Sequence, residues 1–120
     1  MSRPAGRDRG AVTAELALGL PLLLAVTIGL VWLLVVGSAQ VRVVDGAREA
    51  ARALARGDPE SAAFARAAQV AGSGSQVIAI YGEGEVTVTV SRELSGPGGV
   101  FDAWPGVRLR ADAVAAAESP

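Results

Sequence analysis

A glycine and a glutamate five residues apart near the N-terminus are the residues of this sequence best placed to do chemistry. Gly10 precedes Ala11, and Glu15 follows at the start of a long apolar run. An ionised carboxylate at the end of an apolar span is unfavourable unless a cation pairs with it. A cut after Gly10 would place the new ammonium group of Ala11 about one helical turn from Glu15. The spacing therefore predicts a processing site at Gly10 and Ala11 and an ion pair at Glu15.

The predicted ion pair has two forms and one competing interpretation. The ammonium of Ala11 could pair with Glu15 of the same chain, or with that of the next chain in a filament, where an unpaired carboxylate would set the register between neighbours. In the competing interpretation, Glu15 only marks the membrane edge and its side chain reaches the headgroups. The residue types leave both interpretations open.

The composition excludes most other chemistry. The chain has no cysteine and no histidine, which removes disulfides, thiol nucleophiles, imidazole bases and the usual zinc ligands. No pair of acids has the spacing of an acid and base that work together, and no hydroxyl has an evident activating base. The net charge of −1 comes without a basic block, which argues against a nucleic-acid partner. We expect no enzyme activity, no catalytic residues, no cofactor and no metal.

A hydrophobic segment must position Glu15. The stretch from Leu16 to Ala39 has 24 residues and no charge, and as a helix it would span roughly 36 Å, more than the ~30 Å hydrocarbon core of a bilayer. We therefore predict a transmembrane helix over residues 11–39. Pro21 predicts a bend near residues 17–21, and Trp32, at mid-span, is expected to pack against a neighbouring helix or lipid.

The fate of this segment has three alternatives. Residues 1–10 are polar and basic and suit a short cytoplasmic leader, with the C-terminal part on the outer side. A permanent signal anchor would keep the whole chain, as a cell-envelope protein with a small extracytoplasmic binding domain. Conventional signal cleavage after Gly37-Ser-Ala39 would release a secreted domain that starts at Gln40.

The N-terminal tract resembles that of a known family. Arg9-Gly-Ala-Val-Thr-Ala-Glu15, followed by Leu-Ala-Leu-Gly-Leu-Pro21 and the apolar run, is similar to the start of TadE-like proteins, and Asp45-Gly-Ala-Arg-Glu-Ala-Ala-Arg52 resembles the segment that follows their helix. These proteins are minor pilins, or pseudopilins, of tight-adherence (type IVb-like) pili. The resemblance covers roughly residues 9–57.

The resemblance implies a sequence of events for this chain. A prepilin peptidase would cut between Gly10 and Ala11, leaving Glu15 as the fifth residue of the mature chain. The chain would sit in the bacterial cytoplasmic membrane and assemble, by packing of its N-terminal helix through residues such as Pro21 and Trp32, with other pilin-like subunits and the assembly platform.

Beyond the membrane, the helix is expected to continue over residues 40–57. Apolar side chains recur on one face, at Val43, Ala47, Ala50 and Leu54. The opposite face carries charges whose spacing allows the ion pairs Asp45–Arg48 and Glu49–Arg52.

Residues 58–120 are predicted to form a small extracytoplasmic α/β domain. Gly57 should cap the first helix, and Asp58 should be the N-cap of a second helix that runs to about Ala71 on an apolar stripe of Phe64, Ala67, Ala68 and Ala71.

The rest of the chain should form a small antiparallel sheet of two or three strands. A hairpin pairs residues 76–81 with residues 86–91, and the glycines of Gly82-Glu-Gly-Glu85 form its turn rather than a phosphate loop. Val107 to Ala111 is a candidate third strand. Phe101 and Trp104 are expected to cap the core, or to form an exposed patch for a partner. The predicted fold is α+β and pilin-like.

Overall fold

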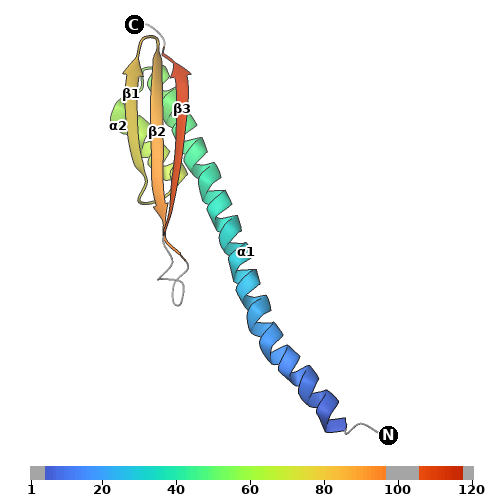
Figure 1. Ribbon diagram of the computed structural model, residues 1–120. Helices are drawn as coiled ribbons and strands as arrows, with labels where there is room; N and C mark the ends of the chain where they lie inside the picture. The colour runs from blue at the N-terminus through green and yellow to red at the C-terminus, as the bar shows by residue number, and fades with distance from the viewer. Residues whose placement is uncertain (1–4, 97–105, 118–120) are drawn as a thin grey trace. The chain divides into compact units, whose positions relative to one another are not determined.

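The computed structural model describes residues 5–96 and 106–117, with side chains from Asp8 onward. Five elements follow one another along the chain: α1 (Ala5–Ala55), α2 (Glu60–Ala71), β1 (Gln76–Gly82), β2 (Glu85–Leu94) and β3 (Val107–Ala116) (Figure 1). The chain divides into two compact units, Met1–Leu34 and Val35–Pro120. The long N-terminal helix, the short second helix and the three-stranded antiparallel sheet confirm the α+β fold predicted from the sequence.

Helix α1 is continuous from the first unit into the second. It passes through Pro21, which lacks the N–H that would otherwise bond the carbonyl of Ala17. The proline therefore does not end the helix, and the bend expected near residues 17–21 stays a prediction. The hydroxyl of Thr27 forms a hydrogen bond within the helix, in which Oγ1 donates to the carbonyl of Leu23 at 2.8 Å.

Gly57 ends α1 as the sequence predicts. Its φ of 88° is left-handed, a conformation that glycine adopts without the Cβ clash of other residues. The N–H of Gly57 donates to the carbonyl of Leu54, and that of Asp58 to the carbonyl of Ala53, both at 3.0 Å. This is the Schellman pattern of a helix C-terminus.

The start of α2 differs from the prediction. The helix begins at Glu60, Pro59 is the N-cap residue, and no side chain caps the first turn. Asp58 does not serve as the N-cap, because its carboxylate lies 3.1 Å from the guanidinium of Arg56. The Pro59 carbonyl still starts the helix by accepting from the N–H of Ala63 at 3.0 Å.

The sheet has the strand order β1-β2-β3, with both neighbouring pairs antiparallel. Gly82 pairs with Glu85 around a two-residue turn in which Gly84 has a φ of 71°, so the glycines serve the hairpin as predicted. Strand β3 forms over ten residues, twice the length expected from Val107 to Ala111. Its extension through Ala115 and Ala116 is set by pairing with Val86 and Glu85.

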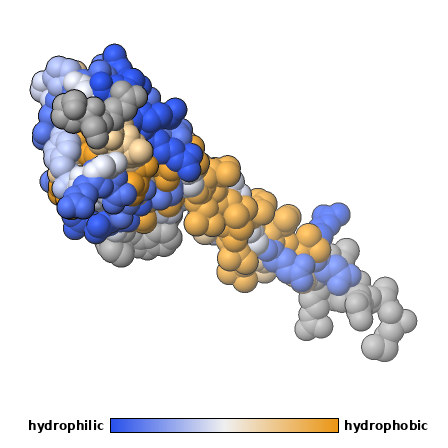
Figure 2. Space-filling view, turned by 90° about the horizontal axis from the view of Figure 1, so that it is seen from above, coloured by the Kyte–Doolittle hydropathy of each residue, from blue (hydrophilic) through white to orange (hydrophobic). Residues whose placement is uncertain are grey.

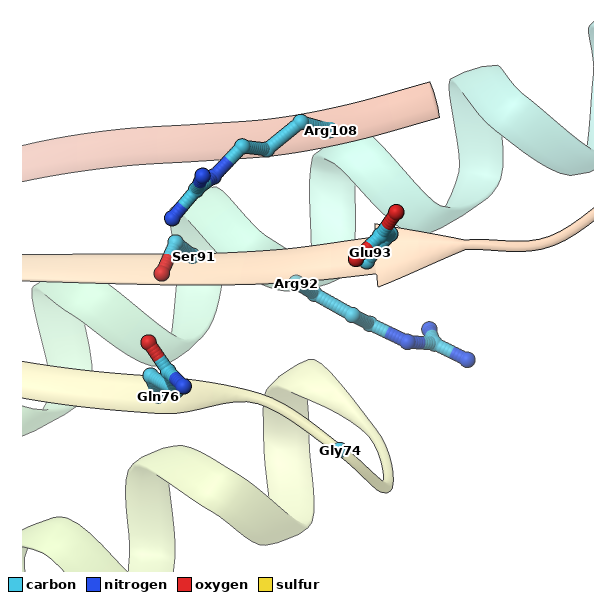
Figure 3. Close-up of a pocket in the computed structure, with 6 residues that line it drawn as sticks. All are labelled: Gly74, Gln76, Ser91, Arg92, Glu93 and Arg108. Carbon is cyan, nitrogen blue, oxygen red and sulfur yellow. The ribbon is translucent and has the colours of Figure 1, made fainter. Parts of the chain in front are cut away.

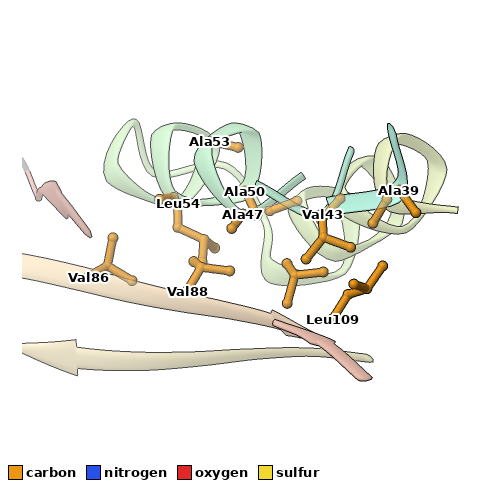
Figure 4. Close-up of a cluster of buried hydrophobic side chains, with 14 residues drawn as sticks. Ala39, Val43, Ala47, Ala50, Ala53, Leu54, Val86, Val88 and Leu109 are labelled. Carbon is orange, nitrogen blue, oxygen red and sulfur yellow. The ribbon is translucent and has the colours of Figure 1, made fainter. Parts of the chain in front are cut away.

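The core lies between the sheet and the second half of α1, together with α2 (Figure 4). Its fourteen buried residues are alanines, valines and two leucines, and its largest fully buried side chains are valines. The predicted apolar face of α1 is confirmed, because Val43, Ala47, Ala50 and Leu54 are all buried. On α2 the buried residues are Ala63, Ala67 and Ala71, so Ala63 replaces Ala68 on the predicted stripe.

Small residues let the two helices approach closely. A Cβ atom added at Gly46 would lie 2.9 Å from the carbonyl oxygen of Ala67 and 3.2 Å from the Cβ of Ala71. Both distances are shorter than ordinary van der Waals contact. Gly46 is therefore required where α1 crosses α2.

Two further expectations are corrected or untested. Among the residues that the structure describes, neither Asp45–Arg48 nor Glu49–Arg52 forms a salt bridge; Glu49 pairs instead with Arg66 of α2 at 3.7 Å. Packing of α2 against α1 places Arg66 near Glu49, and spacing along a single helix does not predict this contact. The expected core-capping residues, Phe101 and Trp104, lie outside the described residues.

Tyr81 links the sheet to α2. Its hydroxyl donates to Oε2 of Glu60 at 3.3 Å. Partial desolvation, the charge of Glu60 and this hydrogen bond all raise the pKa of Tyr81 above 10.0. The neutral phenol is thus favoured by folding, and its contribution to stability is full below about pH 10 and is lost as pH rises through the raised pKa.

The close approach at Gly46 predicts a stability effect. Gly46→Ala should lower the free energy of unfolding, because overpacking typically costs about 1–3 kcal/mol and helix propensity returns only about 1 kcal/mol. Gly37→Ala is the matched control, since its added Cβ meets nothing within 4 Å. Denaturant unfolding of the full chain in detergent, followed by circular dichroism, measures both. Equal or greater stability of Gly46→Ala would contradict the packing argument.

The Tyr81 contact predicts an alkaline titration. Tyr81 is the single tyrosine of the chain, so the rise in ultraviolet absorbance that accompanies ionisation reports one phenol. We expect a midpoint above pH 10 for the folded chain, because Glu60 disfavours the phenolate. The Glu60→Gln variant should titrate at lower pH than the parent chain. An unchanged midpoint in that variant would show that the carboxylate does not act on Tyr81.

Candidate functional site

The candidate processing residues lie in the first part of α1. Gly10, Ala11 and Glu15 are all exposed helical residues. The helix already begins at Ala5, within the predicted leader, and the Thr13 hydroxyl donates to the carbonyl of Arg9 at 2.8 Å across the predicted cleavage point. Gly10 is the weakest helix former of this turn, by about 1 kcal/mol relative to alanine.

The helix brings Ala11 and Glu15 onto one face. Residues four apart in an α-helix are neighbours on its surface. Among the described residues Glu15 forms no salt bridge, and the ion pairs that the structure contains join residues between Glu49 and Asp112. The geometry thus provides the carboxylate and its position, and leaves it accessible to a cation.

The apolar part of α1 is not covered by any other described part of the chain. Its large side chains are exposed, with Leu18 at 77% and Leu34 at 74%. Figure 2 shows a nearly continuous hydrophobic surface along this part of the helix. Over the described residues, α1 is long and apolar enough to cross a membrane. An apolar surface of this kind is compatible with a membrane anchor.

Pro21 and Trp32 lie on the same helix but do not form a site together. Pro21 is exposed and Trp32 is partly exposed. The eleven-residue step from one to the other corresponds to about 16 Å of helix. Any role of these two residues in helix packing therefore involves other molecules rather than each other.

The described part of the sheet domain has a shallow pocket at one end of the strands. The pocket, about 130 Å³, is lined by Gln76, Ser91 and Arg108, with Arg92 pointing away from Ser91 toward the loop at Gly74 (Figure 3). No histidine or cysteine exists to activate the serine. Within residues 5–96 and 106–117, no group of three acids is placed to hold a metal ion.

Arg92 has a structural task instead. Its Nη1 donates to the carbonyl of Ala71 at 3.2 Å, at the C-terminus of α2. Gly72 leaves room for this guanidinium, because a Cβ there would lie 2.7 Å from Nη1. The arginine thus satisfies a terminal carbonyl of the helix and complements its dipole.

Sequence reasoning missed the contacts made by Glu60, Tyr81 and Arg66. The Tyr81–Glu60 bond spans 21 residues and the Glu49–Arg66 pair spans two helices. Neither contact joins residues at a helical or strand spacing, so sequence periodicity does not predict it. The sequence shows only a charged residue or a tyrosine next to an apolar stripe, a pattern common to many protein surfaces.

A comparison with known protein families places the N-terminal segment. Residues 10–52 match the family described as TadE-like protein. No curated protein and no solved structure matches the chain. The matched segment includes every candidate site residue, from Gly10 to Trp32, together with the charged helical turns that end at Arg52. The predicted resemblance is therefore confirmed over residues 10–52, which match the TadE-like family, a family associated with tight-adherence pili.

Proposed function

We propose that the chain is a non-enzymatic minor pilin or pseudopilin of a tight-adherence pilus. It is inserted in the bacterial cytoplasmic membrane with its N-terminus in the cytoplasm and residues 58–120 outside. A prepilin peptidase cuts between Gly10 and Ala11, and the mature helix then packs with other pilin-like subunits at the assembly platform.

One observation carries this proposal. Gly10 and Glu15 lie at the start of a helix whose following apolar residues are exposed. Removal of residues 1–10 would create an ammonium group on Ala11, one turn from a carboxylate that has no cation partner among the described residues. The pair can form within a subunit or between neighbours, and the second form fixes axial register.

A role for Glu15 in assembly explains its position better than a role as a boundary marker. An acidic residue at the centre of a membrane helix costs roughly 3 kcal/mol, and the cost falls toward the ends. A boundary residue needs no defined distance from the N-terminus. Glu15 has one, because it is the fourth residue after Ala11 and shares its helical face.

The buried position of Ala39 favours retention of α1 from Ala11 onward. Ala39 is 5% exposed and belongs to the core cluster, against which Val36 also packs. Conventional signal cleavage after Ala39 would remove both side chains from the domain. A cut after Gly10 leaves that core unchanged.

Intact-mass analysis tests the processing step. Full-length chain, produced in membranes beside an active prepilin peptidase, should lose residues 1–10. The same chain beside an inactive peptidase should keep them, as should Gly10→Val, which enlarges the residue before the cut. Full-length mass beside the active enzyme would instead identify a permanent anchor, and loss of residues 1–39 would identify a conventional signal peptide. Either result contradicts the proposal.

Substitution of Glu15 tests the assembly step. Glu15→Ala and the nearly isosteric Glu15→Gln should still be inserted and cut, but should reduce pilus formation by about tenfold or more, because neither can form an ion pair with an ammonium group. Val12→Ala, at an exposed position of the same helical segment, is the control. Pilus counts by electron microscopy, with mass analysis of the same cells, provide the two readouts. Normal piliation by Glu15→Gln would show that the charge is not used.

A further inference from the structure

Among the described residues, the two edge strands of the sheet, β1 and β3, each have one side that pairs with no other strand (Figure 1). Residues of an antiparallel strand alternately bond their partner and face away from it. The carbonyl of Arg110 accepts from Nε2 of Gln40 in α1 at 3.2 Å, so it faces away from β2. Asp112, Val114 and Ala116 share this phase and present backbone groups at the open side of β3.

Alternate residues of β1 likewise present their backbone groups at its open side. Gly82 and Glu85 flank the two-residue turn, so their backbone groups bond to each other. The same holds two residues further along each strand, for Ile80 and Thr87. Ala79 and Tyr81 therefore face away from β2. In a parallel pair, the backbone N–H and C=O of one residue bond to the two residues that flank the residue opposite it. If Ile80 of another copy lay opposite Val114, the backbone groups of Val114 could therefore bond to Ala79 and Tyr81 of that copy.

These positions lie at the same height across the sheet. Ile80 pairs with Thr87, which pairs with Val114, and these three side chains occupy the face away from the helices. Tyr81, Val86 and Ala115 form the next row, on the face that carries the helices. A sideways step of the whole sheet would thus bring Ile80 of one copy next to Val114 of another.

The two sides carry opposite charge at this height. Arg48 and Arg52 of α1 line a groove of about 390 Å³ with Ala113, Val114 and Ala115 of β3. Among the described residues, no acid forms a salt bridge with either arginine. On the β1 side, Glu60 lies beside Tyr81, to which it is hydrogen-bonded at 3.3 Å.

The opposite face of the sheet offers apolar surface at both edges. Ile80 is 62% exposed and Val114 is 60% exposed. Contact between two β-branched side chains on neighbouring strands is stabilising. Backbone groups, charges and apolar side chains therefore match at one position along both edges.

We propose that the sheet continues from one chain into the next: β1 of a second copy adds alongside β3 in parallel, with Ile80 of the second copy against Val114. Glu60 of the second copy then faces Arg48 and Arg52. This inference rests on the proposed function for its geometry, since two copies anchored in one membrane share an orientation. β1 and β3 run parallel within the sheet because both are antiparallel to β2.

The contact is head-to-tail rather than two-fold. Each copy uses β3 for one neighbour and keeps β1 for another, so the contact repeats along a row of subunits. An antiparallel β3–β3 contact would instead reverse, in one copy, the direction of the part of α1 that packs on the sheet.

Disulfide trapping in membranes tests the pairing. The chain has no cysteine, so Ile80→Cys combined with Val114→Cys introduces the only two thiols. Within one chain these positions are two strand spacings apart, about 9.6 Å, which exceeds the roughly 7 Å reach of a disulfide. Addition of an oxidant to membranes that contain the full chain and prepilin peptidase should therefore give a ladder of dimers, trimers and longer species.

Three controls define the register and the polarity. Each single cysteine variant should stay monomeric, and a co-expressed mixture of the two should stop at dimers. Gln76→Cys with Val114→Cys is the matched control, because Gln76 lies on the same face of β1 but about 13 Å away along the strand. It should give little cross-linking.

Charge reversal tests the Glu60 contact. Glu60→Arg in the double-cysteine chain should reduce the ladder about fivefold, the size expected for an exposed ion pair that becomes repulsive. Adding Arg48→Glu and Arg52→Glu should restore it.

The results separate this inference from the proposed function. A dimer from Val114→Cys alone, an equal ladder from the Gln76 control, or absence of a ladder in the Ile80 and Val114 double variant would each overturn the edge pairing, whether or not the leader has been removed. Failure of charge reversal to change the ladder would overturn the assignment of Glu60. Retention of residues 1–10 in the same sample speaks only against the proposed function.

Discussion

The close approach of small side chains along the second half of α1 is the constraint on which the domain depends. The fourteen buried core residues that the structure describes include no aromatic side chain, so the layers must lie near one another for alanine and valine to touch. Gly46 allows this distance at the helix crossing. The same packing positions the exposed face of α1 and places Arg48 and Arg52 beside β3.

The surface of α1 changes in character along its length. Up to Leu34 most of its large apolar residues are exposed, as suits lipid or other apolar helices. From Ala39 onward its buried residues recur on one face and its charges lie on the other, as suits a domain in water. The TadE-like match over residues 10–52 covers both parts of the helix and lies outside the sheet.

The open edges of the sheet have an energetic consequence. Unpaired backbone groups at an edge strand favour pairing with another chain, and soluble proteins commonly block this with lysine, proline or bulges. β1 and β3 contain no lysine or proline, and the pairing of both is regular. For a subunit that assembles, an open edge is a means of association, while Gln40 covers the part of β3 at Arg110.

Features that depend on local order along the chain could be predicted from the amino-acid sequence, whereas features that depend on distance between elements required the folded chain. The uncharged run after Glu15, the helical period from Val43 to Leu54, the glycine at position 57 and the alternation of valines in β2 each follow from backbone geometry and hydrophobicity. These predicted the long helix, its cap and the hairpin, whereas the family was predicted from the resemblance of residues 9–57 to TadE-like proteins. By contrast, the partner of Glu49 is Arg66, Asp58 bonds Arg56 instead of capping α2, and β3 extends to Ala116 because β2 supplies bonding groups along its full length. The opposite charges at the two edges become aligned only through strand register. Spacing along the chain does not predict such contacts, since they join residues that packing of the core brings together.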